Sequence, residues 1–380
     1  MKWEKVKLGN VTDSCLGKML DQNKNKGDYQ PYLANVNVRW GEFDLEDLPL
    51  MKFEESEQER YELKYGDLVI CEGGEPGRCA IWKKQIPNMK IQKALHRVRV
   101  HDCLDYRYLF YWFLLAGKTG ELDQYFTGAT IKHMPGQKLK EVVIDKPPLE
   151  IQHRIADILS AYDDLIENNQ KQIKLLEEAA QRLYKEWFVD LRFPGHENTK
   201  IVDGVPEGWI KEEIGKIIKK VHRTKQIVAS EYKDEGSIPI VDQSRAFVAG
   251  YTNDLEARVD FGIPIIVFGD HTRIVKLIQF PFAKGADGTQ LIISDCLEMP
   301  QRLLYCSIMN VDLSNYHYAR HFKYLKEEKI MIPTVKVANE FENNVTGIFS
   351  KIQNCRDEII RCQKTRDLLL PKLMSGEVEV

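Results

Sequence analysis

Two long segments of the chain carry apolar residues at alternating steps of three and four positions. The first covers residues 149–189 and has a polar interruption at Asn169, and the second covers residues 336–376 and has Arg366 within its apolar seam. Sustained three-four spacing predicts helices that pair as a coiled coil. A helix of roughly 36 residues spans about 54 Å, longer than one side of a domain of this size. We therefore expect the helices to pair with each other; the alternative is two amphipathic helices, each lying on its own domain.

Three patterns occur in the same order in the two halves of the chain. A Trp stands six residues before a Gly at 3–9 and again at 209–215. An aromatic residue and a Gly lead into an apolar strand and a turn at 65–77 and at 261–271. A segment containing a His, at 130–134 and at 318–322, precedes a Leu-Lys-Glu triplet, an Ile and a Pro. Such internal similarity predicts two domains of the same plan, each with hairpin-like β structure and each followed by a long helix.

The fold class that follows is α+β. We expect two similar mixed α/β globular domains joined by a long antiparallel two-helix coiled coil, a dumbbell with pseudo-twofold symmetry. Turn-forming residues at 192–198 and 203–208 indicate a linker. The predicted boundaries are 1–148 for the first domain, 149–189 for the first helix, 190–206 for the linker, 207–335 for the second domain and 336–376 for the second helix.

Composition narrows the class of protein. The chain has 380 residues, of which 43% are hydrophobic and 29% charged, so it has enough apolar residues for ordinary cores. Its formal net charge of −3 neither supports nor excludes nucleic-acid binding. The eight cysteines include no C-x-x-C pair, and no segment is apolar enough to cross a membrane. We expect reduced thiols in a cytoplasmic protein that is neither secreted nor integral to a membrane.

Motifs of a self-contained enzyme are incomplete in this sequence. The Gly-Lys-Thr at 117–119 lacks the earlier Gly of a phosphate-binding loop, because Trp112 stands there. The Gly-rich segment 73–77 is followed by a strand-like segment rather than a helix, so we interpret it as a turn. The segment 145–148 lacks the aromatic residue of an amino-methyltransferase loop, and the histidines are scattered without metal-ligand spacing. We predict no catalytic residue, no bound cofactor and no metal site.

Basic residues are concentrated in three segments, 83–99, 216–225 and 316–324, and the last of these interleaves them with aromatic residues. Such strips suit contacts to DNA phosphates, with Arg, His and Tyr available for base edges. A solvated basic face is the alternative for any one strip. The segment 42–62 is strongly acidic, and we expect it to point away from DNA.

The candidate DNA-binding residues follow from these strips and from the repeated segments. In the first domain they are Arg78, Lys83, Lys84, Lys90, Lys93, Thr130, Lys132 and His133. In the second domain they are Lys220, Arg223, Arg273, Lys284, Arg320, His321 and Lys323. The lysines suit phosphates better than bases. His133 and His321 occupy matching places, so a shared structural role, such as hydrogen bonding to a loop, stays open beside base reading.

Four motifs carry a family resemblance. They are Pro-Leu-Glu-Ile-Gln at 148–152, the end of the first helix at 183–195, Val-Pro-Glu-Gly-Trp at 205–209, and Leu-Leu-Leu-Pro-Lys-Leu-Met-Ser-Gly at 368–376. Together they resemble the specificity (S) subunit of a type I restriction-modification system, over residues 3–376. Residues 337–341 depart from the usual start of the second helix in that family.

The resemblance implies a non-catalytic subunit of a DNA adenine methyltransferase and ATP-dependent restriction endonuclease. Each target-recognition domain would read one half of a bipartite DNA sequence, and the coiled coil would set the spacer. Two modification subunits with S-adenosylmethionine and two restriction subunits with ATP and Mg would bind around it, with no membrane involved. We expect partner contacts at apolar helix residues, although packing on the recognition domains also explains them: Leu175, Tyr184, Phe188 and Leu368. An orphan DNA-binding or scaffold subunit without active partners is the alternative.

Overall fold

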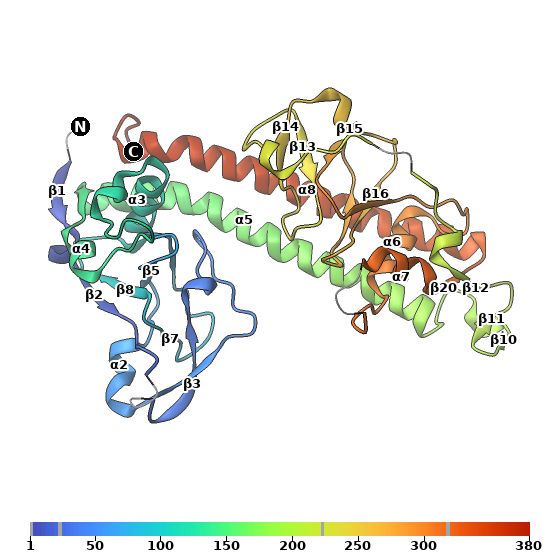
Figure 1. Cartoon of the computed structure of the whole chain (residues 1–380), viewed down its shortest axis with the longest axis horizontal. Coiled ribbons are helices and arrows are strands. Elements are labelled where there is room, and N and C mark those ends of the chain that lie inside the picture. Colours follow the sequence, from blue (N-terminus) through green and yellow to red (C-terminus); the bar gives the residue numbers. More distant parts are fainter. Residues whose placement is uncertain (1–2, 22–24, 222–223, 317–319) are drawn as a thin grey trace. The chain divides into compact units, whose positions relative to one another are not determined.

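The computed structural model describes residues 3–21, 25–221, 224–316 and 320–380. The chain divides into two compact units. Unit 1 comprises Met1–Glu167 together with Ile359–Val380, and unit 2 comprises Asn168–Glu358. The last residues of the chain therefore belong to the same unit as the first, and each long helix passes from one unit into the other (Figure 1).

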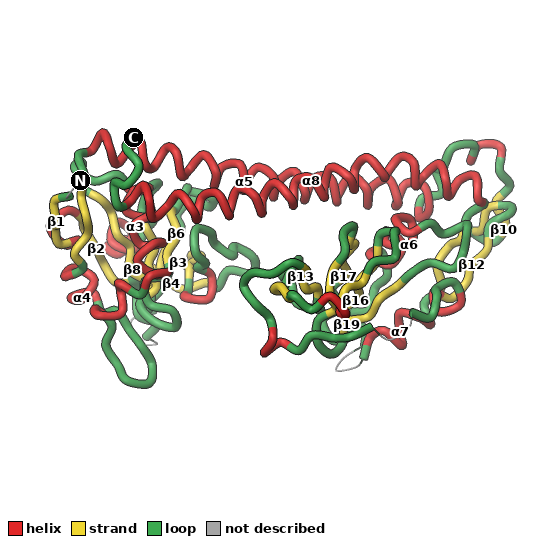
Figure 2. The backbone as a smooth tube through the Cα atoms, turned by 90° about the horizontal axis from the view of Figure 1, so that it is seen from above, coloured by secondary structure: helices red, strands yellow, loops and turns green. Residues whose placement is uncertain are grey.

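The two long helices are present, and they pair. Helix α5 covers Leu149–Tyr184 and continues as a short π-helical turn at Lys185–Val189, while helix α8 covers Val335–Met374. Within each unit their segments run antiparallel and lie side by side (Figures 1 and 2). Apolar residues at three-four spacing form the seam, as a coiled coil requires. The prediction that the helices pair with each other is confirmed.

Polar residues that interrupt the seam are paired across it. In unit 1, Arg366 Nη1 donates to Asp163 Oδ1 at 2.5 Å, and the Tyr111 hydroxyl donates to Asp163 Oδ2 at 2.6 Å. In unit 2, Asn169 Nδ2 donates to Glu358 Oε2 at 3.0 Å. Removing one partner of such a pair leaves a buried polar group unsatisfied, which costs free energy. The pairs therefore favour one register of the helices over shifted ones.

The described residues of unit 1 form three small sheets and four α-helices besides their parts of α5 and α8. The sheet orders are β1-β9, β2-β8-β5-β6 and β4-β3-β7, and all pairs are antiparallel except β3 with β7. The strands are β1 Glu4–Lys7, β2 Thr12–Leu16, β3 Asp28–Leu33, β4 Leu50–Phe53, β5 Leu68–Cys71, β6 Cys79–Ile81, β7 Lys90–Ile91, β8 Leu95–Val100 and β9 Val143–Lys146. The helices are α1 Leu8–Val11, α2 Gln58–Tyr61, α3 Tyr106–Thr119 and α4 Gly136–Glu141.

Unit 2 repeats this plan. Its sheet orders are β12-β20, β14-β13-β18-β15 and β17-β16-β19, and β13 with β18 is the parallel pair. The strands are β12 Ile210–Glu213, β13 Ile238–Val241, β14 Gly250–Thr252, β15 Arg258–Val259, β16 Ile265–Gly269, β17 Val275–Ile278, β18 Phe282–Lys284, β19 Thr289–Ile292 and β20 Lys329–Ile332. The helices are α6 Gln301–Met309 and α7 His321–Glu327. A hairpin of β10 Ile201–Val202 and β11 Val205–Pro206 lies in the predicted linker.

The repeat read from the sequence is confirmed by strand pairing. The strand after the first Trp pairs with the strand before the long helix in both units: Glu4 lies opposite Lys146, and Ile210 lies opposite Ile332. The predicted hairpins are β5 with β6 and β16 with β17. The two mixed units of an α+β protein, with their antiparallel helices, are thus as expected.

The glycine of the Trp-containing motif has the same role in both units. A Cβ placed on Gly9 would lie 2.9 Å from the Cβ of Lys140, and one on Gly215 would lie 3.1 Å from the Cβ of Lys326. Both lysines belong to the Leu-Lys-Glu triplets, which are the last three residues of α4 and of α7. In each unit the Trp-containing motif thus packs against the Leu-Lys-Glu triplet, which explains why both motifs occur in both halves of the sequence.

Two of the predicted partner-binding residues belong to the core of unit 2. Tyr184 and Phe188 are each only 5% exposed, and their rings lie 6.3 Å and 5.1 Å from the ring of Phe341. The expectation of a partner contact at these residues is wrong, because the unit's own aromatic cluster covers them. Leu175 and Leu368 are 65% and 60% exposed and are not covered.

The core of unit 2 should depend strongly on Phe341, which is fully buried among these rings. We expect Phe341→Ala to lower the free energy of unfolding by about 3–5 kcal/mol, through lost burial and the cavity left behind. The matched control, Leu175→Ala on the exposed face of α5, should change it by less than about 0.5 kcal/mol. Urea unfolding followed by tryptophan fluorescence measures both. Equal losses would contradict this description of the core.

Candidate nucleic-acid interface

Two loops of each unit come together beside its parallel strand pair. In unit 1 the loop at 34–40 follows β3, and the turn at 72–78 joins β5 to β6. In unit 2 the loop at 242–249 follows β13, and the turn at 270–274 joins β16 to β17. We call each pair of segments the loop edge of its unit. The repeated topology brings the two loop edges to equivalent places in the two units.

Side chains hold the loop edge of unit 1 by bonding to one another and to the backbone. Asn35 Nδ2 donates to the Gly73 carbonyl at 3.0 Å, and Arg78 Nη2 donates to the Asn35 carbonyl at 3.1 Å. Arg78 Nη1 and Trp40 Nε1 both donate to the Glu75 carboxylate, at 3.0 and 2.7 Å. The Arg78 side chain is only 16% exposed. Arg78, predicted to contact DNA, is thus part of the scaffold of this edge.

An open groove of about 610 Å³ lies beside the loop edge of unit 1. Trp40, Phe126, Thr130 and Lys132 are among the residues that line it. Lys132 Nζ lies 3.4 Å from Asp123 Oδ2 and 5.7 Å from the centre of the Phe126 ring. The predicted residues Thr130 and Lys132 are therefore exposed together in one depression, with aromatic faces beside a cation.

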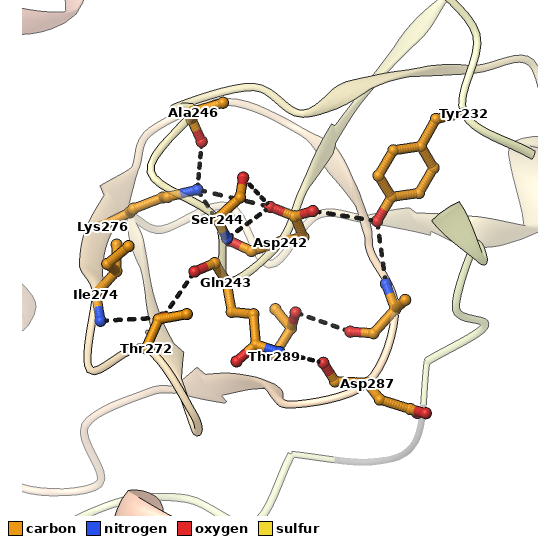
Figure 3. A network of polar contacts seen from close by, with 11 residues as sticks. Tyr232, Asp242, Gln243, Ser244, Ala246, Thr272, Ile274, Lys276, Asp287 and Thr289 are labelled. Atoms are coloured by element: carbon orange, nitrogen blue, oxygen red, sulfur yellow. Dashed lines mark hydrogen bonds and ion pairs between the residues drawn. The ribbon is translucent and has the colours of Figure 1, made fainter. Parts of the chain in front are cut away.

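In unit 2, Gln243 bonds to the turn of the loop edge and to the neighbouring segment at Asp287 (Figure 3). Gln243 Nε2 donates to the Asp287 carbonyl at 2.8 Å, and Gln243 Oε1 accepts from the His271 amide at 3.1 Å. The Thr272 hydroxyl donates to the Gln243 carbonyl at 2.7 Å. Gln243 thus occupies the place that Asn35 has in unit 1, at the start of the loop that follows the parallel strand.

A buried lysine lies beneath the loop at 242–249 (Figure 3). The Lys276 side chain is 4% exposed, and its Nζ donates to the Asp242 and Ala246 carbonyls at 2.9 and 2.5 Å. Burial lowers the pKa of Lys276 to about 8, although the Asp242 carboxylate, 4.0 Å away, acts in the opposite direction. A buried ammonium needs such acceptors, so Lys276 joins Asp242, at the start of the loop, to Ala246 in its middle.

The paired histidines both contact the turn of the loop edge. His321 is 5% exposed, and its ring nitrogens each lie 2.9 Å from a backbone carbonyl, of Asp270 and of Tyr316. His133 forms backbone bridges with Gly73 and Thr127 and is exposed. The shared contact fits the structural role that the sequence left open, and burial of His321 excludes it from a surface that meets DNA.

Two lysines of the basic strip at 83–99 are not available to DNA as predicted. Lys90 is fully buried, with its Nζ 3.3 Å from Glu62 Oε2, and burial lowers its pKa. The prediction for Lys90 is wrong because an acid distant in the sequence pairs with it inside the core. Lys83 is half exposed and lies 2.6 Å from Glu167 Oε2 of α5.

In unit 2 the predicted cations differ in exposure and in bonding partners. Arg273 is exposed, but its Nη1 donates to the Leu313 carbonyl at 3.0 Å. Lys284 is half-buried, and burial lowers its pKa. Arg223 lies outside the described residues. The predicted cations that are exposed and whose side chains make neither an ion pair nor a hydrogen bond with a described residue are Lys84, Lys93, Lys220, Arg320 and Lys323.

The residues that organise the loop edges were not found from the sequence. Asn35, Gln243 and Lys276 belong to no charge run, and neither does Arg245, an exposed residue of the loop at 242–249. Asn35 and Gln243 each stand two residues after a strand of the parallel pair, β3 or β13, and no repeated motif marks these strands. A run of basic residues in the sequence shows where cations are, but it does not show which acids distant in the chain pair with them.

Among the described residues, no cluster of three or more His, Cys, Asp or Glu side chains could hold a metal ion. The Gly-Lys-Thr at 117–119 forms the last turn of α3 rather than a loop before a helix. In the part of the chain that the structure describes, no helix has both the length and the apolar character of a membrane span.

The sequence is similar to those of known proteins of one family. Residues 1–178 match the family model of the type I restriction modification DNA specificity domain. The type I restriction enzyme MjaIX specificity subunit of Methanocaldococcus jannaschii is 31% identical over 343 residues, which cover 83% of this chain and 78% of that protein. The MjaVIII specificity subunit of the same organism is 28% identical over 240 residues, 62% of this chain and 53% of that protein.

The fold has a counterpart among solved structures. The crystal structure of a type I restriction-modification system S subunit from M. genitalium matches with a TM-score of 0.58 and 17% sequence identity, over 98% of this chain and 96% of that one. At this identity the match shows the fold alone.

The buried lysine makes stability depend on pH. Its pKa of about 8 in the folded chain is below the ordinary value of 10.5, so unfolded chains bind more protons between these values. The contribution of Lys276 to stability is therefore lost as the pH falls through 8 and grows toward 10.5. We expect wild type to gain stability relative to Lys276→Met between pH 7.5 and pH 9.5 in urea unfolding. A difference that is constant with pH would contradict a lowered pKa for Lys276.

Proposed function

The chain belongs to the family of type I restriction-modification specificity subunits, and on this premise we propose that each of its two units reads one half of a bipartite DNA sequence. The observation that carries the proposal is the loop edge, which occurs once in each unit on the same strand plan. A subunit that recognises two different half-sites needs one scaffold with two sets of side chains. The loop edges have this property, because Asn35 and Gln243 hold equivalent loops whose other residues differ.

Base reading needs side chains in fixed positions at the groove, whereas phosphate contacts tolerate flexible cations. We assign phosphate contacts to the exposed, unpaired cations of the predicted set: Lys84, Lys93, Lys220, Arg320 and Lys323. Thr130 and Lys132, which line the groove of unit 1, are assigned to contacts of the first unit with DNA. Neutralising phosphates makes affinity fall with salt, and this part of the affinity is independent of sequence.

The paired helices would fix the distance between the two half-sites. Two of their exposed apolar residues, Leu175 and Leu368, are proposed contacts with modification subunits. In this arrangement the chain catalyses no step. Two modification subunits would bind S-adenosylmethionine and methylate an adenine extruded from the helix, and two restriction subunits would use ATP and Mg. This chain would provide the sequence specificity and the spacing.

The test is single-molecule methylation sequencing of the source genome with and without this gene. We expect N6-methyladenine to disappear from one motif with two specified halves and an unspecified spacer when the gene is deleted. If no motif loses its methylation, the chain is not the specificity subunit of an active methylating complex. Copurification with modification subunits would then distinguish an orphan subunit, which has no such partners, from a subunit of a complete but inactive complex.

The assigned phosphate contacts predict a distinct effect on binding. We expect Lys323→Ala to weaken binding of the purified complex about equally to cognate and unrelated duplexes, and to reduce the slope of log K against log salt by about 1. Salt titrations with both duplexes measure this effect. Loss of affinity for the cognate duplex alone would contradict the assignment, since it would indicate base reading.

A further inference from the structure

Hydrogen bonds fix the loop at 242–249 in unit 2 on both sides of Arg245. Lys276 Nζ bonds to the Asp242 carbonyl before Arg245 and to the Ala246 carbonyl after it. Ser244 donates to Asp242 Oδ1 through its amide at 2.9 Å and its hydroxyl at 2.6 Å. These bonds fix the backbone that presents the Arg245 side chain.

The far end of this loop is anchored to the long helices. The Phe247 ring lies 3.7 Å from the guanidinium carbon of Arg356, a residue of α8, and 6.0 Å from the Phe280 ring. Arg356 Nη2 in turn donates to Glu177 Oε1 of α5 at 2.8 Å. A cation against an aromatic face in a half-buried place is a favourable contact. The loop therefore has anchors at both ends as well as beneath.

The Arg245 side chain takes no part in the bonds that hold this loop. It is exposed and makes no hydrogen bond or ion pair with any described residue. Two other exposed arginines of unit 2 differ, since Arg273 donates to the Leu313 carbonyl and Arg258 pairs with Asp260 at 2.9 Å. Because the loop backbone is already held in place, binding through Arg245 has to order the side chain but not the loop.

Resting on the proposed function above, we propose that Arg245 is a specificity-determining residue of unit 2, which reads a guanine edge in one half-site, and that Lys276 positions it. The planar guanidinium donates two parallel hydrogen bonds, which match the O6 and N7 acceptors of guanine in the major groove. Exposed lysines on flexible stems do not have this selectivity. The bonds of Lys276 to the backbone fix the position from which the Arg245 side chain extends.

The test uses the full chain, expressed with the modification subunit of its own system in a host that lacks it, followed by methylation sequencing of the host chromosome. We expect Arg245→Ala to relax one G·C position in one half of the motif. Discrimination there should fall by roughly 5- to 150-fold, and the other half should be unchanged. The matched control, Arg258→Ala, should leave the motif as in wild type.

Two results would overturn the inference. An unchanged motif with Arg245→Ala means that Arg245 reads no base, and a uniform fall in methylation across all sites means that it contacts phosphate. Absence of any bipartite motif with the wild-type chain would instead count against the proposed function itself. The two failures are thus distinguishable in the same data.

The positioning role of Lys276 has its own readout. We expect Lys276→Met and Lys276→Gln to relax the same position as Arg245→Ala. The double variant Lys276→Met with Arg245→Ala should show no further change, because both changes remove one interaction. If the soluble Lys276 variants lower methylation at both halves in proportion to their thermal stability, the lysine is only structural. If one of Lys276→Met and Lys276→Gln does not fold, the result of the other variant decides.

Discussion

Neither unit has a closed core without both long helices, and the rest of the structure depends on this constraint. In unit 1, Ile155 and Leu159 of α5 and Leu370 and Leu373 of α8 belong to the same apolar cluster as the sheet residues. In unit 2, α5 supplies Tyr184, and α8 supplies Phe341 to the aromatic centre. Since the end of α8 is part of unit 1, that unit cannot complete its core until the last residues of the chain are present. The helices are thus structural members of the units as well as connections.

This constraint explains why the scaffold is alike in the two units while the loops differ. The strands that flank each helix start, β9 and β20, pair with β1 and β12 in matching register, so both sheets are positioned from the helices. The loop edges lie beside other strands of the units, since their first loops follow β3 and β13. Different bonds hold the loop edges, from Asn35 in unit 1 and from Gln243 and Lys276 in unit 2. A subunit that must present two different DNA-reading surfaces at a fixed spacing benefits from this separation.

The sequence predicted those features that depend on local periodicity or repetition. Three-four spacing identified both helices, and repeated motifs identified two units of the same plan. It failed where the partner of a residue is distant in the chain. Lys90 meets Glu62, and Arg99 meets Asp67 in two bonds of 2.7 Å, so a basic strip in the sequence is not a basic surface. Tyr184 and Phe188 were misplaced for the same reason, since an apolar helix face does not reveal which element covers it.

The central claim is that the two units recognise DNA separately on a common scaffold. The most direct measurement replaces residues 207–334 with the corresponding segment of a specificity subunit of different known target, and determines the methylated motif of the resulting complex. The account predicts that one half of the motif changes to that of the donor, while the other half and the spacer stay the same. A change in both halves, or in the spacer alone, would contradict it.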